Sequence, residues 1–355
     1  MSPCMTLGRT VLIFAVVWVS AISLLHRQLN ATPDSKGSST SGEAKLQVGF
    51  IPVTCHLTCP VTDFINKSMT GKSTFRPLRF SGFPELKEAL ISGHIEAGFI
   101  LAPLAMVLRQ QGVKMKIVYL GHRDGTALMV RKDSDVHSIQ DLRGKRIAVP
   151  NRFSNQYLLL FKVLRERGLS LKDIELVELP PPDMPAALYA KAVDAITSGE
   201  PFMAQTELDG YGRVLYLTKD VWPNFISCVL VVREDVIQNQ RGLVQTLVDG
   251  IARSGKWLDS DTAHRNEAAQ FVAKNYYNQH PRLLSYVLSK PPDRVRYTNL
   301  SVRRRDFEEI EQLAREAGVL KGAVTFDSYA DDSFVKEDTA VVPWDFQAAA
   351  QGAPL

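Results

Sequence analysis

The chain has 355 residues, of which 45% are hydrophobic, so it is longer than one hydrophobic core usually serves and two domains are expected. Its 42 basic and 38 acidic residues leave a formal net charge of +4 without a long basic run. Nothing in this charge pattern requires a nucleic-acid partner.

The N-terminal segment is the first predicted feature. An uncharged apolar run at 11–25 follows Arg9 and precedes a polar stretch of small residues at 32–43. The run is shorter than the roughly 20 residues that cross a bilayer, and the small residues suited to signal cleavage lie inside it. We therefore expect residues 1–44 to be an export signal, or an uncleaved anchor, with a flexible tether. The rest of the chain should then lie in the periplasm or another extracytoplasmic space.

Strands and helices are expected to alternate in the next part of the chain. Apolar strands are predicted at 46–52, 78–81, 97–101 and 116–120. A loop at 53–60 leads into a helix that ends near residue 67, and further helices are predicted at 84–92 and 103–111. This alternation is typical of a mostly parallel, doubly wound α/β sheet.

The same alternation restarts after a strand at 126–131. The later predicted strands lie at 146–149, 175–179, 214–217 and 226–232, with a helix at 154–167. The last of these strands is expected to return to the first lobe, because helices follow it at 241–257, 264–275, 281–288 and 303–317. We expect lobe one at 45–125 and 233–320, lobe two at 126–232, and a C-terminal extension at 321–355. The two crossings between lobes would form a hinge.

An internal repeat supports this division. Residues 85–105 and 183–203 align without a gap, and each residue in the second copy follows its match by 98 positions. The acid-Ala pair at 96–97 matches the pair at 194–195, and Pro103 matches Pro201. Each copy reads as an amphipathic helix, a short apolar strand and a helix opened by proline. We therefore expect two similar lobes that face each other across a cleft.

Five segments resemble the substrate-binding proteins of ABC importers, of the nitrate/sulfonate/bicarbonate/taurine type. They lie in the family's order at 49–54, 93–103, 141–149, 193–202 and 228–235. The resemblance implies a type II periplasmic binding protein fold and a monomeric receptor that closes on a small anionic or small organic solute. It also implies ABC permease and ATPase subunits as partners at the membrane. The chain departs from the nitrate and bicarbonate binders at 54–60, where it reads Thr-Cys-His-Leu-Thr-Cys-Pro.

The candidate ligand-binding residues follow predicted strands or open predicted helices. Ligands of open α/β sheets bind beyond the carboxyl ends of strands, where helix N-termini also favour anions and polar groups. By this rule the candidates are Thr54, Cys55, His56, Cys59, Ser154, Asn155, Glu200 and Cys228. His122 follows a predicted strand and could also approach the cleft, although a loop histidine with internal partners is an alternative.

The three cysteines beyond the leader permit several interpretations. Cys55 could form a disulfide with Cys59 or with Cys228, while His56 packs in the loop. Neutral polar groups of this loop could instead contact the solute directly. A third alternative is a soft-metal site of Cys55, His56 and Cys59, because thiolate and imidazole donors suit zinc or copper. No cofactor is expected.

The remaining candidates have structural alternatives as well. Ser154 and Asn155 belong to the preferred N-cap residues, so they could cap a helix, contact the solute, or do both. Glu200 stands in an apolar context at a predicted helix start, where an unpartnered carboxylate is costly. It could cap the helix or bind a cationic or N–H-bearing ligand.

The sequence favours a binding protein over an enzyme. It contains no convincing Ser-His-Asp triad, Walker loop or Rossmann glycine pattern. The alternatives are an enzyme on the same fold, similar to thiamine-pyrimidine synthase, and an anchored sensory domain. The solute stays open among nitrate, bicarbonate, a sulfonate, a heteroaromatic precursor and a metal complex.

Overall fold

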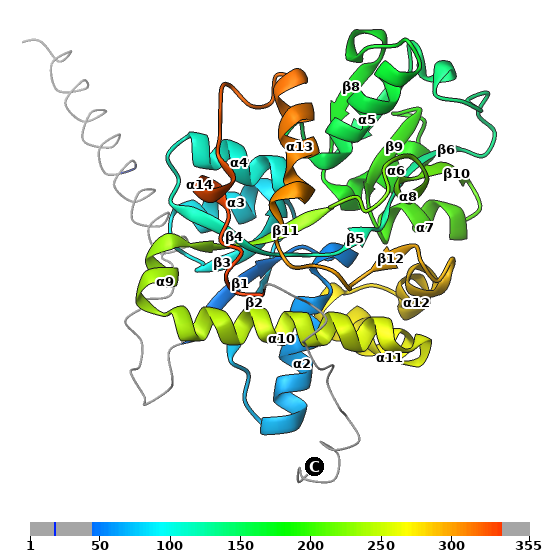
Figure 1. Cartoon of the computed structure of the whole chain (residues 1–355). Helices are drawn as coiled ribbons and strands as arrows, with labels where there is room; N and C mark the ends of the chain where they lie inside the picture. The colour runs from blue at the N-terminus through cyan, green and yellow to red at the C-terminus, as the bar shows by residue number, and fades with distance from the viewer. Residues whose placement is uncertain (1–17, 19–44, 336–355) are drawn as a thin grey trace, which may run out of the picture. The chain divides into compact units, whose positions relative to one another are not determined.

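The computed structural model describes residue 18 and residues 45–335 (Figure 1). The chain divides into two compact units, Met1–Ala44 and Lys45–Leu355. The predicted export signal, anchor and tether therefore lie outside the described residues, except for Trp18, as does the end of the chain after residue 335. In the described residues, no helix is both long and apolar enough to cross a membrane.

The first lobe is built on a five-stranded sheet with the order β2-β1-β3-β11-β4. Its strands are β1 (Leu46–Phe50), β2 (Phe75–Arg79), β3 (Ala97–Leu101), β4 (Met115–Leu120) and β11 (Cys228–Arg233). Strand β1 pairs in parallel with β2 and β3, whereas β11 runs antiparallel to both of its neighbours. The predicted return of the chain to the first lobe is therefore present in β11. The range 126–232 given to lobe two is too long, because β11 pairs with strands of the first sheet.

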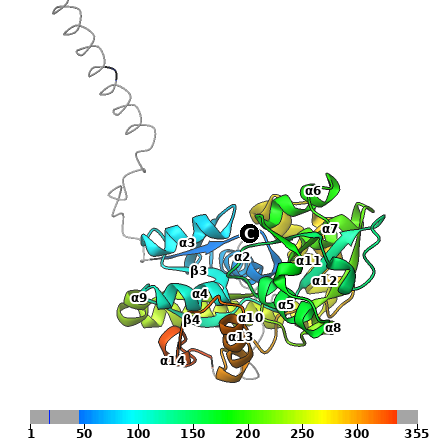
Figure 2. The same cartoon turned by 90° about the horizontal axis from the view of Figure 1, so that it is seen from above.

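The second lobe repeats this arrangement. Its strands are β6 (Thr126–Arg131), β7 (Arg146–Val149), β8 (Glu175–Glu178), β9 (Ala195–Gly199) and β10 (Gly212–Leu217). Read from β8, the order β8-β7-β9-β6-β10 matches the first sheet, and β6 is the antiparallel strand in fourth place. The two sheets lie side by side in both views (Figures 1 and 2). The predicted two-lobed fold with mostly parallel sheets is confirmed.

Helices follow the parallel strands and cover the sheets, as Figure 2 shows from above. The helices of the first half are α2 (Thr58–Thr70), α3 (Phe83–Ile91), α4 (Ala102–Gln110), α5 (Asn155–Glu166), α6 (Met184–Tyr189), α7 (Phe202–Leu208) and α8 (Thr218–Val221). Those of the second half are α9 (Glu234–Asn239), α10 (Arg241–Ser260), α11 (Thr262–Val272), α12 (Pro281–Ser289), α13 (Arg304–Glu316) and α14 (Phe326–Tyr329). The predicted loop at 53–60 is shorter than expected, because a turn of 3-10 helix, η1 (Thr54–His56), leads almost directly into α2.

The sequence repeat corresponds to a structural repeat. Strands β3 and β9 begin and end 98 residues apart, and the acid before each strand has the same role. Glu96 Oε2 accepts the backbone N–H of Gln47 at 2.7 Å, and Asp194 Oδ2 accepts that of Arg146 at 2.8 Å. Each carboxylate thus ties the start of its strand to the neighbouring parallel strand, so the acid-Ala pair marks one local structure used twice.

The lobes are joined by more chain segments than the sequence predicts. A short strand β5 (Arg123–Asp124) pairs with β12 (Val295–Arg296), and Arg123 also forms a bridge with Ile226. The crossings near residues 125 and 226 were expected, but the third segment was not. It brings side chains of the C-terminal region to the point where the lobes meet.

The described part of the predicted C-terminal extension packs on the first sheet. Ala330 forms a parallel bridge with Ile117, and the N–H of Asp331 donates to the Ile117 carbonyl at 2.9 Å. Lys116 Nζ donates to the carbonyl of Ser328 at 2.9 Å. Residues up to 335 therefore extend the first lobe instead of standing apart from it.

The matched carboxylates give a first prediction. Glu96→Ala and Asp194→Ala should each lower the free energy of unfolding by about 1–2 kcal/mol, because each leaves a strand N–H without its charged acceptor. Urea unfolding measures the loss, with exposed Glu308→Ala as the control. If either substitution costs no more than the control, the carboxylate is not what ties its strand in place.

Candidate functional site

A small cavity lies between the lobes at the carboxyl ends of the parallel strands. Leu101 ends β3, Gly199 ends β9, Pro150 follows β7, and Cys55 lies in the turn after β1. The residues that line it are Val53, Cys55, Phe83, Leu101, Pro150, Gln156, Pro181, Ser198, Gly199, Ser227 and Cys228. The volume open to the centre of a water molecule is about 10 Å³, which is near the smallest that can hold one water. This is where open α/β sheets bind ligands.

Two of the predicted residues meet in this cavity. Cys55 Sγ lies 2.9 Å from Cys228 Sγ, and both side chains are about 1% exposed. All three cysteines of the described part are free, so the structure contains neither predicted disulfide. Cys59 does not line the cavity, because it belongs to the first turn of α2 and is fully buried there.

The two cysteines differ in their electrostatic surroundings. Burial alone would raise the pKa of Cys55, but the hydrogen bond with Cys228 and the nearby His56 outweigh burial and hold this pKa well below its usual value. Burial and the interaction with Cys55 raise the pKa of Cys228. Of the two buried thiols, Cys55 therefore has the lower pKa.

The backbone beside the cysteines leaves room only for glycine at position 121. The N–H of Gly121 donates to the carbonyl of Cys228 at 2.8 Å. A Cβ atom added to Gly121 would overlap the carbonyl oxygen of Cys55 and crowd that of Cys228. The absence of a side chain therefore lets the two cysteine backbones approach each other.

Side chains of the C-terminal region hold the turn that carries Cys55. Tyr277 Oη donates to the carbonyl of Val53 at 2.7 Å, and Tyr297 Oη donates to that of Thr54 at 2.9 Å. Both phenols are buried. The position of Cys55 therefore depends on residues that are more than 200 positions away in the chain, and no local sequence pattern points to them.

Thr54 connects the two lobes directly. Its N–H donates to the carbonyl of Glu200 at 2.7 Å, and its hydroxyl donates to the same oxygen at 3.2 Å. His122 Nε2 lies 3.0 Å from Thr54 Oγ1. Since the threonine proton goes to the carbonyl, Nε2 carries the imidazole proton and Nδ1 has none, and this buried Nδ1 has no hydrogen-bond partner. Thr54 and Glu200 thus form a contact between the lobes, and His122 lies against Thr54 on the first-lobe side.

The carboxylate of Glu200 is already occupied by protein groups. Arg294 Nε donates to Oε1 at 2.7 Å, and the N–H of Ala204 donates to Oε2 at 2.8 Å. The side chains of Glu200 and Arg294 are 0% and 3% exposed. The capping interpretation thus describes Glu200 in this structure. Its arginine partner was missed because no local pattern relates positions 200 and 294.

The start of α5 combines a cap with polar groups that face the other segments. Ser154 accepts the N–H of Tyr157 at 3.1 Å, so it is the N-cap. Asn155 Nδ2 donates to the carbonyl of Ile226, and Gln156 Nε2 donates to Thr126 Oγ1 at 3.1 Å. Asn155 Oδ1 and Gln156 Oε1 are buried without a hydrogen-bond partner. Gln156 and the similarly unpartnered Ser227 line the cavity, and neither was among the predicted ligand-binding residues.

His56 packs inside the first lobe. Its Nδ1 accepts the N–H of Ile51 at 2.8 Å, and its ring lies against Phe83 and Phe99. One potential ligand atom from each of Cys55, His56 and Cys228 lies within 4.8 Å of the others. In the described residues, the donor that joins Cys55 and His56 is therefore Cys228, not the predicted Cys59.

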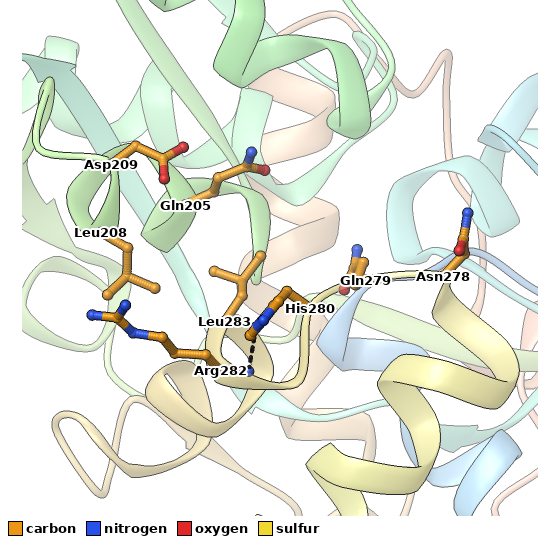
Figure 3. A pocket seen from close by; sticks show the side chains of 8 residues that line it. All are labelled: Gln205, Leu208, Asp209, Asn278, Gln279, His280, Arg282 and Leu283. Atoms are coloured by element: carbon orange, nitrogen blue, oxygen red, sulfur yellow. Dashed lines mark hydrogen bonds between the residues drawn. The ribbon is translucent and has the colours of Figure 1, made fainter.

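A larger surface pocket of about 480 Å³ lies elsewhere, between α7 and the start of α12 (Figure 3). It is lined by Gln205, Leu208, Asp209, Asn278, Gln279, His280, Arg282 and Leu283. His280 Nδ1 accepts the N–H of Arg282 at 3.1 Å within it. None of the predicted ligand-binding residues lines this pocket, and it faces the C-terminal end of α7. We therefore do not take it as the candidate site, although it is larger than the cavity between the lobes.

The crowding at Gly121 leads to a second prediction. Gly121→Ala should lower the free energy of unfolding by about 1–3 kcal/mol, because its methyl group must displace backbone atoms of Cys55. Gly242→Ala is the matched control, since its added methyl meets open space in a helix and should be neutral or slightly stabilising. Equal stabilities in urea would contradict the close approach at position 121.

The buried imidazole gives a third prediction. Burial lowers the pKa of His122 to about 4, below the roughly 6.5 of an unfolded chain. Between these pH values only the unfolded chain binds the proton. The free energy of unfolding should therefore fall as pH drops through this window, by up to about 3 kcal/mol, and His122 should contribute no further loss below it. His122→Gln should remove this part of the slope in urea unfolding measured from pH 7 to pH 4, and parallel curves would contradict the buried neutral state.

Known proteins share both the sequence pattern and the fold. A protein of Brachyspira hyodysenteriae, provisionally named as an ABC transporter periplasmic binding protein, is 24% identical, with 93% of this chain and 94% of that protein covered. The taurine-binding periplasmic protein of Escherichia coli is 31% identical over 47% of this chain and 52% of its own. The zinc-bound ligand-binding component of an ABC-type import system from Staphylococcus aureus has a TM-score of 0.74 at 24% identity, over 83% of this chain and 99% of that one.

These comparisons confirm the resemblance to substrate-binding proteins and the periplasmic binding protein fold. The model of the NMT1-like family matches residues 39–273, which is well over half of the chain. The chain belongs to the NMT1-like family.

Proposed function

We propose that this protein is the extracytoplasmic solute-binding component of an ABC importer. It closes its two lobes on a small solute and presents the closed form to permease and ATPase subunits at the membrane, without chemical turnover. The names of the relatives support this role, since one is a periplasmic binding protein of an ABC transporter by its provisional name and another binds taurine.

The observation that carries the proposal is the cavity and the contact beside it. The cavity lies at the carboxyl ends of strands from two sheets of the same order, and Thr54 and Glu200 join the lobes next to it. A solute held there would touch both lobes, so its binding energy would favour the closed arrangement over an open one. The predicted hinge crossings near residues 125 and 226 allow such a motion.

The lining of the cavity supports a receptor more than an enzyme. Its polar groups in the described residues are two thiols, two serine hydroxyls and one amide, and no carboxylate or imidazole is among the residues that line it. General acid–base catalysis normally uses those missing groups. We therefore propose binding in place of catalysis. We also propose that the protein is a monomer and lies outside the cytoplasmic membrane.

A fourth prediction tests this role. A solute of the receptor should raise the melting temperature by mass action and reduce the radius of gyration in small-angle X-ray scattering. Nitrate, bicarbonate, taurine, an alkanesulfonate and thiophilic metal ions form the panel. Gln156→Ala should weaken binding by about tenfold if one hydrogen bond is lost.

Gln205→Ala is the matched control, because it makes the same change in the surface pocket of Figure 3. The proposal fails if no solute of the panel compacts the protein, if a solute is chemically converted, or if both glutamine variants weaken binding equally.

A further inference from the structure

Two sulfur atoms from distant parts of the chain meet at the solute cavity. Cys55 comes from η1 and Cys228 from the first position of β11, and their Sγ atoms are 2.9 Å apart. Both line the cavity and both belong to the first lobe. When the lobes part, this pair therefore stays together on one wall of the cleft.

Most other polar groups near this pair already have protein partners. Both oxygens of Glu200 accept hydrogen bonds from Arg294 and Ala204. The hydroxyl and N–H of Thr54 donate to a carbonyl. These groups hold the lobes together and are not available to a guest without breaking that contact.

His56 is a weak candidate for the third ligand. Its Nδ1 accepts the Ile51 N–H, so the proton of the neutral ring is on Nε2. A metal-bound imidazole instead has a bare ligating nitrogen and donates from its other nitrogen to an acceptor. His56 is thus arranged as a donor beside the sulfurs. The unpartnered oxygens that reach the cavity are those of Gln156 and Ser227.

The size and the donor set indicate a single soft ion. The space of about 10 Å³ suits one atom better than a molecule. Thiolate sulfur selects Cu(I) and zinc among the common ions. Zinc in closed protein sites usually takes four cysteine or histidine ligands, whereas the cavity is lined by two cysteines and no histidine, and its other donors are neutral oxygens. None of the described residues that line it is cationic, so an oxyanion would find no opposite charge.

We propose that the cleft binds one soft monovalent ion of the Cu(I) class between the sulfurs of Cys55 and Cys228. The inference rests on the proposed function, because this ion would be the solute on which the lobes close. Binding forms two metal–sulfur bonds and releases the thiol protons, with no change of oxidation state. Metal–sulfur bonds of about 2.3 Å place two sulfurs roughly 3.7 Å apart at a tetrahedral angle and roughly 4.6 Å apart when the ion lies in line between them. The pair, now 2.9 Å apart, must therefore separate by about 1–2 Å, into the cavity that both side chains border.

The test is a titration of the full chain, reduced and without oxygen, with Cu(I) supplied from a coloured chelator that competes for it. We expect one ion per chain, an ultraviolet sulfur-to-copper charge-transfer band and a raised melting temperature. Cys55→Ser and Cys228→Ser should weaken binding by more than the 10–100-fold typical of lost second-shell partners. Cys59→Ser is the matched control, because it removes a buried thiol outside the cavity and should leave the affinity unchanged.

Four outcomes would overturn the inference. The first two are an equal loss of Cu(I) affinity in all three serine variants, and an unchanged Cu(I) affinity in Cys55→Ser and Cys228→Ser. The third is tighter binding of Zn²⁺ than of Cu(I). The fourth is a native protein in which thiol titration finds Cys55 and Cys228 joined as a disulfide. Cys55→Ala and Cys228→Ala repeat the measurement if the serine variants unfold. If an organic solute compacts the protein and Cu(I) does not bind, the copper site is contradicted but the receptor role is supported. Copper binding without compaction supports the sulfur site and contradicts the receptor role.

Discussion

The structure around the cleft depends on the hydrogen bond from the Thr54 N–H to the Glu200 carbonyl, 2.7 Å long and buried. It joins the turn after β1 to the turn after β9, so it sets how closely the carboxyl ends of the two sheets approach. Each partner is held from behind by the C-terminal region, Thr54 through Tyr297 and Glu200 through Arg294. When a hydrogen bond between a buried amide and a carbonyl breaks, both groups must be solvated or find new partners. Opening of the lobes therefore exchanges this bond for water, and a solute that touches both walls shifts the balance back.

The repeated sheet explains why such a contact forms at all. Each lobe has the same strand order, with one antiparallel strand in fourth place. These strands are β11 and β6, and the chain enters each of them after crossing from the other lobe. Two copies of one sheet then present the carboxyl ends of their parallel strands to each other, and both sets of loops and helix starts face the same space. In the first lobe that space is bordered by sulfur, since β11 opens with Cys228 and the turn after β1 carries Cys55. The chemistry of the cleft is thus decided by a few positions on a scaffold used twice.

Local patterns were sufficient to predict much of this fold. The 98-residue offset placed β3 and β9 correctly, and the apolar run at 226–232 identified the strand that returns to the first sheet. The predicted site was less complete. Asn155 was named because it opens a predicted helix, and Cys228 because it lies on the returning strand near the hinge. Arg294, Tyr297 and the short β5–β12 pair depend instead on contacts between distant segments, which have no local signal. Cys59 illustrates a different limit: α2 begins at Thr58, inside the loop predicted at 53–60, and Cys59 in its first turn does not line the cavity.

Closure of the two lobes on a solute is tested most directly by the distance between the lobes in solution. Ile91 and Tyr189 are exposed, occupy matching positions of the repeat and lie at the ends of α3 and α6, one in each lobe. Spin labels attached at Ile91→Cys and Tyr189→Cys report this distance by pulsed electron spin resonance. We expect a broad distance distribution without solute, and a narrower distribution with a different mean when a solute is bound. A distribution that stays the same when a solute is bound at saturation would contradict closure of two lobes on a guest.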